Sequence, residues 1–106
     1  MRVKKIIKKQ KNKKNKMAEK RERLDVIYDM LQAIIRNNNE IGPTRLIQLS
    51  NLSPVMFREY TKDLIEQELI HEIEKKNKKF YTVSDKGYKF IEKYKTFKSF
   101  ISELGI

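Results

Sequence analysis

Residues 43–67 of the chain, PTRLIQLSNLSPVMFREYTKDLIEQ, contain two short helical segments joined by a tight turn. The first segment opens with a proline, which suits a first helical turn, and extends to about Leu49. The second opens at Ser53, whose hydroxyl suits a helix cap and precedes a proline, and it extends to about Gln67. The three residues between them, 50–52, therefore join two helices at a close turn.

A longer amphipathic helix precedes this pair. Apolar residues from Leu24 to Ile35 recur at spacings of three and four residues, which predicts a helix from about Ala18 to Arg36. Three consecutive asparagines, at 37–39, then break the period. The pair of short helices is thus the second and third of a series.

The third helix has two chemically different faces. Its apolar side shares one face by helical periodicity and is predicted to be buried: Phe57, Tyr60, Thr61, Leu64 and Ile65. The opposite side is predicted to be free, with Arg58 on its flank: Val55, Glu59, Lys62 and Glu66. This helix therefore packs on one side and presents the other.

A basic hairpin follows the third helix. Residues 69–74 and 80–83 carry alternating apolar side chains, which predicts two short strands. The predicted turn between them holds four lysines and one asparagine: Lys75, Lys76, Asn77, Lys78 and Lys79. Such a hairpin has a mobile, positively charged turn, which can contact a phosphate strand or enter a minor groove.

A final helix begins after Ser84 and Asp85, which offer caps, and reaches about Glu103. Mostly apolar residues recur along it at alternating steps of three and four, the spacing of a heptad seam: Gly87, Phe90, Tyr94, Phe97, Ile101 and Leu104. The complete order predicts a mainly α fold with a small two-stranded β-hairpin (α+β), a winged helix-turn-helix with a long C-terminal helix.

The chain is strongly basic, and most of the excess lies at one end. Of 106 residues, 25 are Lys or Arg and 14 are Asp or Glu, which gives a formal net charge of +11. Residues 1–16 contain nine of the cations and no acid, which predicts a disordered arm whose natural partner is a polyanion. An alternative translation start at Met17 leaves the arm's presence in the native protein open. We therefore divide the chain into this arm, a winged helix-turn-helix over 17–84 and a dimerisation helix over 85–106.

The composition excludes several classes of protein. The chain has no cysteine for disulfides or thiolate metal sites, and a single histidine, His71, cannot build a histidine metal cluster. No apolar run is long enough to cross a bilayer. Neither a glycine-rich phosphate loop nor a nucleophile motif accompanies His71. The sequence predicts no enzyme, no metal and no cofactor, and a cytoplasmic, nucleoid-associated location.

One distinctive stretch follows the hairpin, YTVSDKG at residues 81–87, and LDVIYDML at 24–31 accompanies it. With residues 52–53, 69–70, 90–91 and Tyr94, these stretches resemble the small archaeal winged helix-turn-helix DNA-binding proteins that dimerise through a long C-terminal helix, some of them chromatin-associated. The resemblance covers about residues 21–97, and it implies double-stranded DNA and a second copy of the chain as partners. One departure is Glu68, which stands where such proteins carry glycine, so the easy left-handed glycine cap is absent.

In a helix-turn-helix, the N-terminal half of the second helix reaches base edges. Arg58 is the strongest candidate, because its planar fork can bond guanine O6 and N7 together. Val55 can touch a thymine methyl, Ser53 can reach a phosphate or a base, and Lys62 suits a phosphate. Backbone contacts are predicted for the start of the second helix and for the hairpin: Thr44, Arg45, Lys75, Lys76, Asn77, Lys78 and Lys79.

The last helix extends beyond what a core of three short helices can cover. Its far half would leave exposed aromatic residues without a partner helix, so we predict a homodimer, with antiparallel pairing favoured by the resemblance over parallel pairing. The predicted dimerisation residues are Phe90, Tyr94, Phe97, Ile101 and Leu104, with Phe100 extending the same seam. A two-fold dimer would read half-sites about 34 to 36 Å apart, or wider multiples, and so palindromic DNA.

Three functions remain open at this point. A dimeric double-stranded DNA-binding protein that regulates transcription is the leading hypothesis. An architectural chromatin-type protein that coats DNA is the first alternative. The second is a protein-interaction winged helix within a larger transcription or repair assembly, since Glu59 and Glu66 on the free face of the third helix repel a phosphate backbone.

Overall fold

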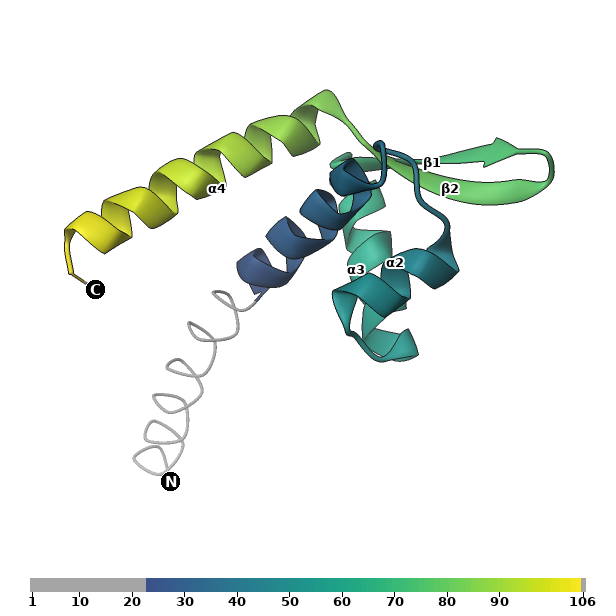
Figure 1. The fold of residues 1–106 in the computed structure, drawn as a ribbon, viewed down its shortest axis with the longest axis horizontal. Coiled ribbons are helices and arrows are strands. Elements are labelled where there is room, and N and C mark those ends of the chain that lie inside the picture. The colour runs from purple at the N-terminus through teal and green to yellow at the C-terminus, as the bar shows by residue number, and fades with distance from the viewer. Residues whose placement is uncertain (1–22, 106) are drawn as a thin grey trace, which may run out of the picture.

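The computed structural model describes residues 23–105, which form four helices and one hairpin (Figure 1). A first helix, described over residues 23–36, leads to the short helix pair. The remaining elements are α2 (Pro43–Ser50), α3 (Pro54–Glu66), β1 (Ile70–Lys75), β2 (Lys78–Val83) and α4 (Asp85–Glu103). The predicted fold class and element order are confirmed. The predicted arm over 1–16 and the predicted helix start at Ala18 lie outside the described residues.

The core lies where the helices meet the base of the hairpin. The first helix contributes Met30, Leu31 and Ile34, which are fully buried, and α2 contributes Leu46. Ile41, in the loop before α2, and the buried residues of α3 and of the elements after it complete the cluster: Phe57, Tyr60, Leu64, Leu69, Ile70, Tyr81, Val83 and Ile91. The predicted stripes of the first and third helices therefore do face one another.

One predicted core residue is wrong. Ile65 is 36% exposed, whereas its neighbour Leu64 is 1% exposed. One step along a helix turns a side chain by about 100°, so the residue after Leu64 lies at the edge of the buried stripe. The buried polar residue of α3, Thr61, donates its hydroxyl to the carbonyl of Phe57 at 2.9 Å.

The hairpin turn is shorter than predicted. Strands β1 and β2 pair in antiparallel register up to Lys75 opposite Lys78, which leaves only Lys76 and Asn77 in the loop. Both loop residues have positive φ, 50° and 65°, and this is typical of the two-residue turn that matches strand twist. Lys75, Lys78 and Lys79 therefore lie in the strands and not in the turn.

The asparagine run after the first helix has a role that its helix-breaking character does not suggest. The side-chain oxygen of Asn39 accepts a hydrogen bond from the Val83 backbone nitrogen at 2.7 Å. Two residues later, Ile41 and Tyr81 exchange backbone hydrogen bonds of 3.1 and 2.8 Å. The loop thus runs beside β2 and fixes the base of the hairpin against the helices.

Glu68 adopts the conformation that a glycine would favour. Its φ is 61°, and its backbone nitrogen donates to Ile65 while that of Leu69 donates to Leu64. This pair of bonds is a Schellman motif, in which the residue after the helix is left-handed. The carbonyl of Glu68 also accepts from the Ser84 hydroxyl at 2.6 Å. The chain therefore reverses between α3 and β1 without the expected glycine.

Glu68→Gly should raise the free energy of unfolding by about 1 kcal/mol. A left-handed residue with a Cβ costs roughly 1–2 kcal/mol, and the extra freedom of glycine in the unfolded chain offsets part of that gain. Urea unfolding followed by circular dichroism measures the change. Glu68→Ala removes the same charge but keeps the Cβ, so it should change stability little. An equal gain in both variants would assign the effect to the lost carboxylate.

Candidate nucleic-acid interface

The start of α3 is an exposed and well-capped helix end. Ser53 is the cap: its side-chain oxygen accepts from the Met56 backbone nitrogen at 3.2 Å, and its carbonyl accepts from that of Phe57 at 2.8 Å. Val55 is 55% exposed, and Arg58 and Lys62 are exposed as well. Ser53 and the three residues of α3 that were predicted to contact DNA therefore all lie on the surface.

The free face of α3 also carries acids, as the sequence indicates. Glu59 and Glu66 are exposed, and among residues 23–105 neither forms an ion pair. Arg58 and Lys62 likewise form no ion pair with a described residue. The cations of this face are thus available to an external anion, although the acids limit how much negative charge the face attracts.

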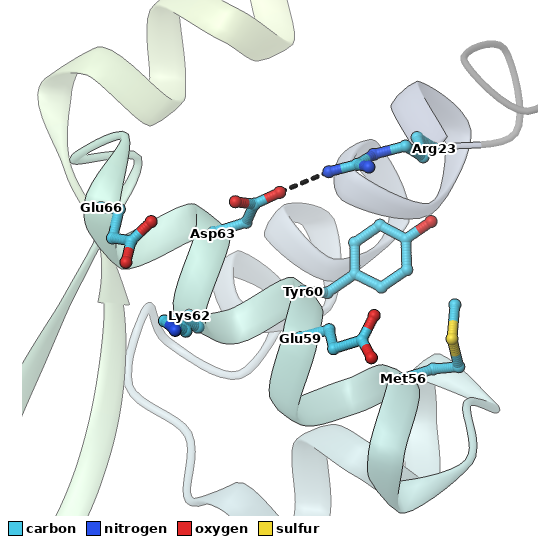
Figure 2. Close-up of a pocket in the computed structure, with 7 residues that line it drawn as sticks. All are labelled: Arg23, Met56, Glu59, Tyr60, Lys62, Asp63 and Glu66. Carbon is cyan, nitrogen blue, oxygen red and sulfur yellow. Dashed lines mark hydrogen bonds and ion pairs between the residues drawn. The ribbon is translucent and has the colours of Figure 1, made fainter. Parts of the chain in front are cut away.

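A groove of about 560 Å³ separates α3 from the first helix. Figure 2 shows Arg23 of the first helix in an ion pair with Asp63 of α3 across this groove. The Arg23 guanidinium also lies 5.8 Å from the centre of the Tyr60 ring. These contacts join α3 to the first helix. The sequence did not reveal them, because Arg23 and Asp63 are 40 residues apart and neither belongs to a motif.

The start of α2 supplies two further exposed polar residues, Thr44 and Arg45. The cap position, Gly42, offers no side chain to the first-turn amides of α2. Unsatisfied amides at a helix start favour an anion, although α2 alone is a short helix. Both residues are therefore accessible, and their contact with DNA stays a prediction.

The hairpin carries fewer free charges than its lysine count suggests. Lys75 pairs with Glu40 at 2.7 Å, and Lys79 pairs with Glu72 at 3.3 Å. The hydrogen bond to Glu72 raises the pKa of Lys79. Lys76 and Lys78 form no ion pair with a described residue, and Asn77 lies exposed beside them in the turn. The charge available to a polyanion is therefore concentrated at the tip.

The predicted dimerisation residues fall into two groups. Phe90 packs against the core and Tyr94 is half-buried, so the first half of α4 is held by its own domain. Farther along, Phe97 is 51% exposed and Leu104 is 54% exposed, while Ile101 is half-buried. Phe100, at 55%, belongs to the exposed group as well. In Figure 1, this far half of α4 extends away from the hairpin.

Tyr94 is the anchor of α4 on the first helix. Its ring stacks on that of Tyr28, with 4.3 Å between centroids, and its hydroxyl donates to Asp25. Burial and the hydrogen bond to Asp25 raise the pKa of Tyr94 above its ordinary value, so the hydroxyl keeps the proton that it donates. Lys98, one turn later, lies 3.8 Å from the same carboxylate. These contacts hold α4 against the first helix as far as Lys98.

The described residues bring together no group that suits a metal ion. Across 23–105, no three His, Cys, Asp or Glu side chains lie close enough to form such a site. Within the same range, no helix has the length and apolar character needed to cross a membrane.

Comparisons with known proteins agree with this architecture. The winged helix-turn-helix family matches residues 20–102, whereas no curated protein sequence matches the chain. Sso10a-2, a DNA-binding protein from Sulfolobus solfataricus, is 18% identical, with a TM-score of 0.65 over 76% of this chain and 82% of that one. TubR from Bacillus thuringiensis, bound to 24 bp of tubC, is 25% identical, with a TM-score of 0.61 over 77% and 91%. A MarR family transcriptional regulator from Silicibacter pomeroyi is 14% identical, with a TM-score of 0.64 over 96% and 70%.

The family match spans the first helix, the helix pair, the hairpin and nearly all of α4. The resemblance to small archaeal winged-helix DNA-binding proteins, inferred from the sequence, is confirmed by this match and by the likeness to Sso10a-2. The chain belongs to the winged helix-turn-helix family.

Proposed function

We propose that the protein binds double-stranded DNA as a two-fold dimer and regulates transcription on the nucleoid. The observation that carries this proposal is the exposed face of α3, where Arg58 and Lys62 form no ion pair with a described residue. The family and the DNA bound to the similar TubR support it. Recognition helices of this kind enter the major groove.

Each part of the surface has a distinct role in this proposal. Arg58 reads a guanine through O6 and N7, and Val55 packs on a thymine methyl. Ser53 and Lys62 contact the flanking phosphates, as Thr44 and Arg45 do from α2. The hairpin contacts the adjoining backbone through its free tip charges, Lys76 and Lys78, with Lys75, Asn77 and Lys79 beside them.

Dimerisation is proposed through the far half of α4. Three large apolar side chains of this half are more than half exposed, and a second copy of α4 would cover them: Phe97, Phe100 and Leu104. Ile101 completes the seam, whereas Phe90 and Tyr94 support it from inside the domain. A symmetric pair would bind palindromic sites.

Fluorescence anisotropy on palindromic and random duplexes over a series of salt concentrations tests the function. A regulator should prefer a palindrome obtained by selection from random sequences, at every salt concentration. A steep salt slope without sequence preference would instead favour a chromatin-type coating protein. Absence of DNA affinity would favour the protein-interaction function, for which exposed Glu59 and Glu66 are the supporting observation.

Deletion of residues 1–16 should weaken binding to random DNA and flatten its salt dependence. The segment contains nine cations, and each phosphate that it neutralises contributes about 0.9 to the slope of log affinity against log salt concentration. Anisotropy gives the slope, and sedimentation and circular dichroism check that assembly and fold are retained. An unchanged slope would show that the arm does not contact DNA.

Arg58→Ala should cost about 1–3 kcal/mol on the selected site and relax the preference at one base pair. The reason is that a bidentate pair with guanine has no equivalent on the other bases. Lys62→Ala is the matched control, since a phosphate contact should weaken all duplexes alike. A uniform loss for Arg58→Ala would reassign Arg58 to the backbone.

A further inference from the structure

A second groove, of about 640 Å³, lies between the first helix and the turn that joins α2 to α3. Its volume falls within the range of small-molecule sites, about 300–1,000 Å³. The first helix lines one side with Tyr28 and Arg36, and α2 lines the other with Arg45 and Leu49. It is separate from the groove of Figure 2, which shares no lining residue with it.

Part of the lining of this second groove is apolar. Val26 and Ala33 of the first helix and Leu52 of the turn contribute half-buried side chains. Leu49 also lines the groove and is 45% exposed, so its side chain is accessible to a ligand. A ring or a branched aliphatic group placed here would cover this apolar area.

The polar groups of the groove divide into satisfied and available ones. Ser50 donates its hydroxyl to the carbonyl of Leu46 at 2.8 Å, and Asn37 donates its amide to that of Ala33 at 3.0 Å. Tyr28 accepts from the Gln32 amide at 3.1 Å, which leaves its own hydroxyl hydrogen available as a donor.

The charged groups of the groove are also available. The guanidinium groups of Arg36 and Arg45 form no ion pair with a described residue, and both are exposed. The groove holds a single carboxylate, Asp29, against these two cations, so its net charge is positive. Guanidinium groups bind carboxylates through two parallel hydrogen bonds.

We infer that this groove binds a small organic anion, a carboxylate carried on an aromatic or branched aliphatic body. Arg36 and Arg45 hold the carboxylate, Tyr28 offers a further donor, and the apolar body lies against Leu49 and Leu52. Both features contribute to binding, because a bare inorganic anion does not cover the apolar residues and a neutral ring forms no ion pair with either guanidinium group. The site shares Arg45 with the proposed DNA contact. The inference does not rest on that proposal, since it is tested on the free protein.

Benzoate is a suitable probe for a titration of the isotope-labelled full chain, followed by NMR. A ligand of this size should bind with a Kd on the order of 1 mM and should shift the methyl signals of Ala33, Leu49 and Leu52. Benzamide, which has the same ring without the charge, and inorganic phosphate, which has charge without a ring, should each bind about tenfold more weakly.

Arg36→Gln should weaken benzoate binding about tenfold, since it removes a charged hydrogen-bond donor from the surface of the groove. Arg58→Gln is the matched control and should leave benzoate binding unchanged, because Arg58 does not line the groove. Three results would each overturn the inference: equal binding of benzamide or phosphate, equal loss in both variants, or no saturable methyl shift at concentrations on the order of ten times the expected Kd. DNA binding does not enter any of these measurements.

Discussion

Gly87→Ala is expected to lower the free energy of unfolding by about 3 kcal/mol or more. A Cβ on Gly87 would overlap the carbonyl oxygen of Leu69 and would lie 2.6 Å from a methyl carbon of Val83. Neither neighbour can move freely, because the Leu69 carbonyl accepts from the Ser84 nitrogen at 3.0 Å and Val83 is bonded to Asn39. Alanine favours a helix over glycine by about 1 kcal/mol, so the steric conflict exceeds the helix-forming gain.

Urea unfolding of Gly87→Ala beside Gly42→Ala measures this effect. Gly42 is the matched control, because its Cβ would meet only the Lys79 carbonyl oxygen at an ordinary 3.8 Å and its φ is −79°. We expect Gly42→Ala to stay within about 0.5 kcal/mol of the parent protein. Equal stabilities of the two variants would mean that α4 does not approach Leu69 as closely as described.

Phe97→Asp combined with Phe100→Asp is expected to yield monomers and to weaken binding to a palindromic duplex about a hundredfold. The two carboxylates would lie in the apolar seam, where burial of an unpaired charge is strongly unfavourable. A monomer contacts only one half-site of the palindrome. Two linked binding sites bind about 10²–10⁴ more tightly than a single one, so loss of the dimer should lower the affinity. Affinity for a single half-site should change little.

Sedimentation velocity and anisotropy on the same samples test this prediction. Ser99→Asp with Ser102→Asp is the control, since it adds the same charge to exposed positions of α4 that lie away from the seam. A double variant of the phenylalanines that remained dimeric would place the contact elsewhere on the surface. Circular dichroism checks that each variant keeps its fold.

The elements of this fold could be predicted from the sequence because their signals are local. Ser53 and Ser84 each lie three residues before the amide that they cap, and both caps form as expected. The stripe of the first helix and the alternation of the hairpin likewise need only a short window of sequence. Local chemistry therefore determined which segments are helices and strands.

What could not be predicted depends on residues distant in the chain. Asn39 bonds to Val83 across 44 positions, and the requirement for glycine at 87 arises from the backbone of Leu69. The pairing of Lys75 with Glu40 reduces the free charge of the hairpin, and no spacing rule relates the two. The left-handed Glu68 shows that tertiary contacts can impose a backbone conformation against residue preference.

The stacking of Tyr94 on Tyr28 has a consequence for how a symmetric pair would search for its target. Because the first half of α4 is held against the domain, the DNA-binding surface and the far half of α4 would move as one rigid unit in a dimer. The distance between the two α3 helices of the dimer would then be fixed by the length of α4. Operators with one base pair added or removed between the half-sites would therefore bind more weakly.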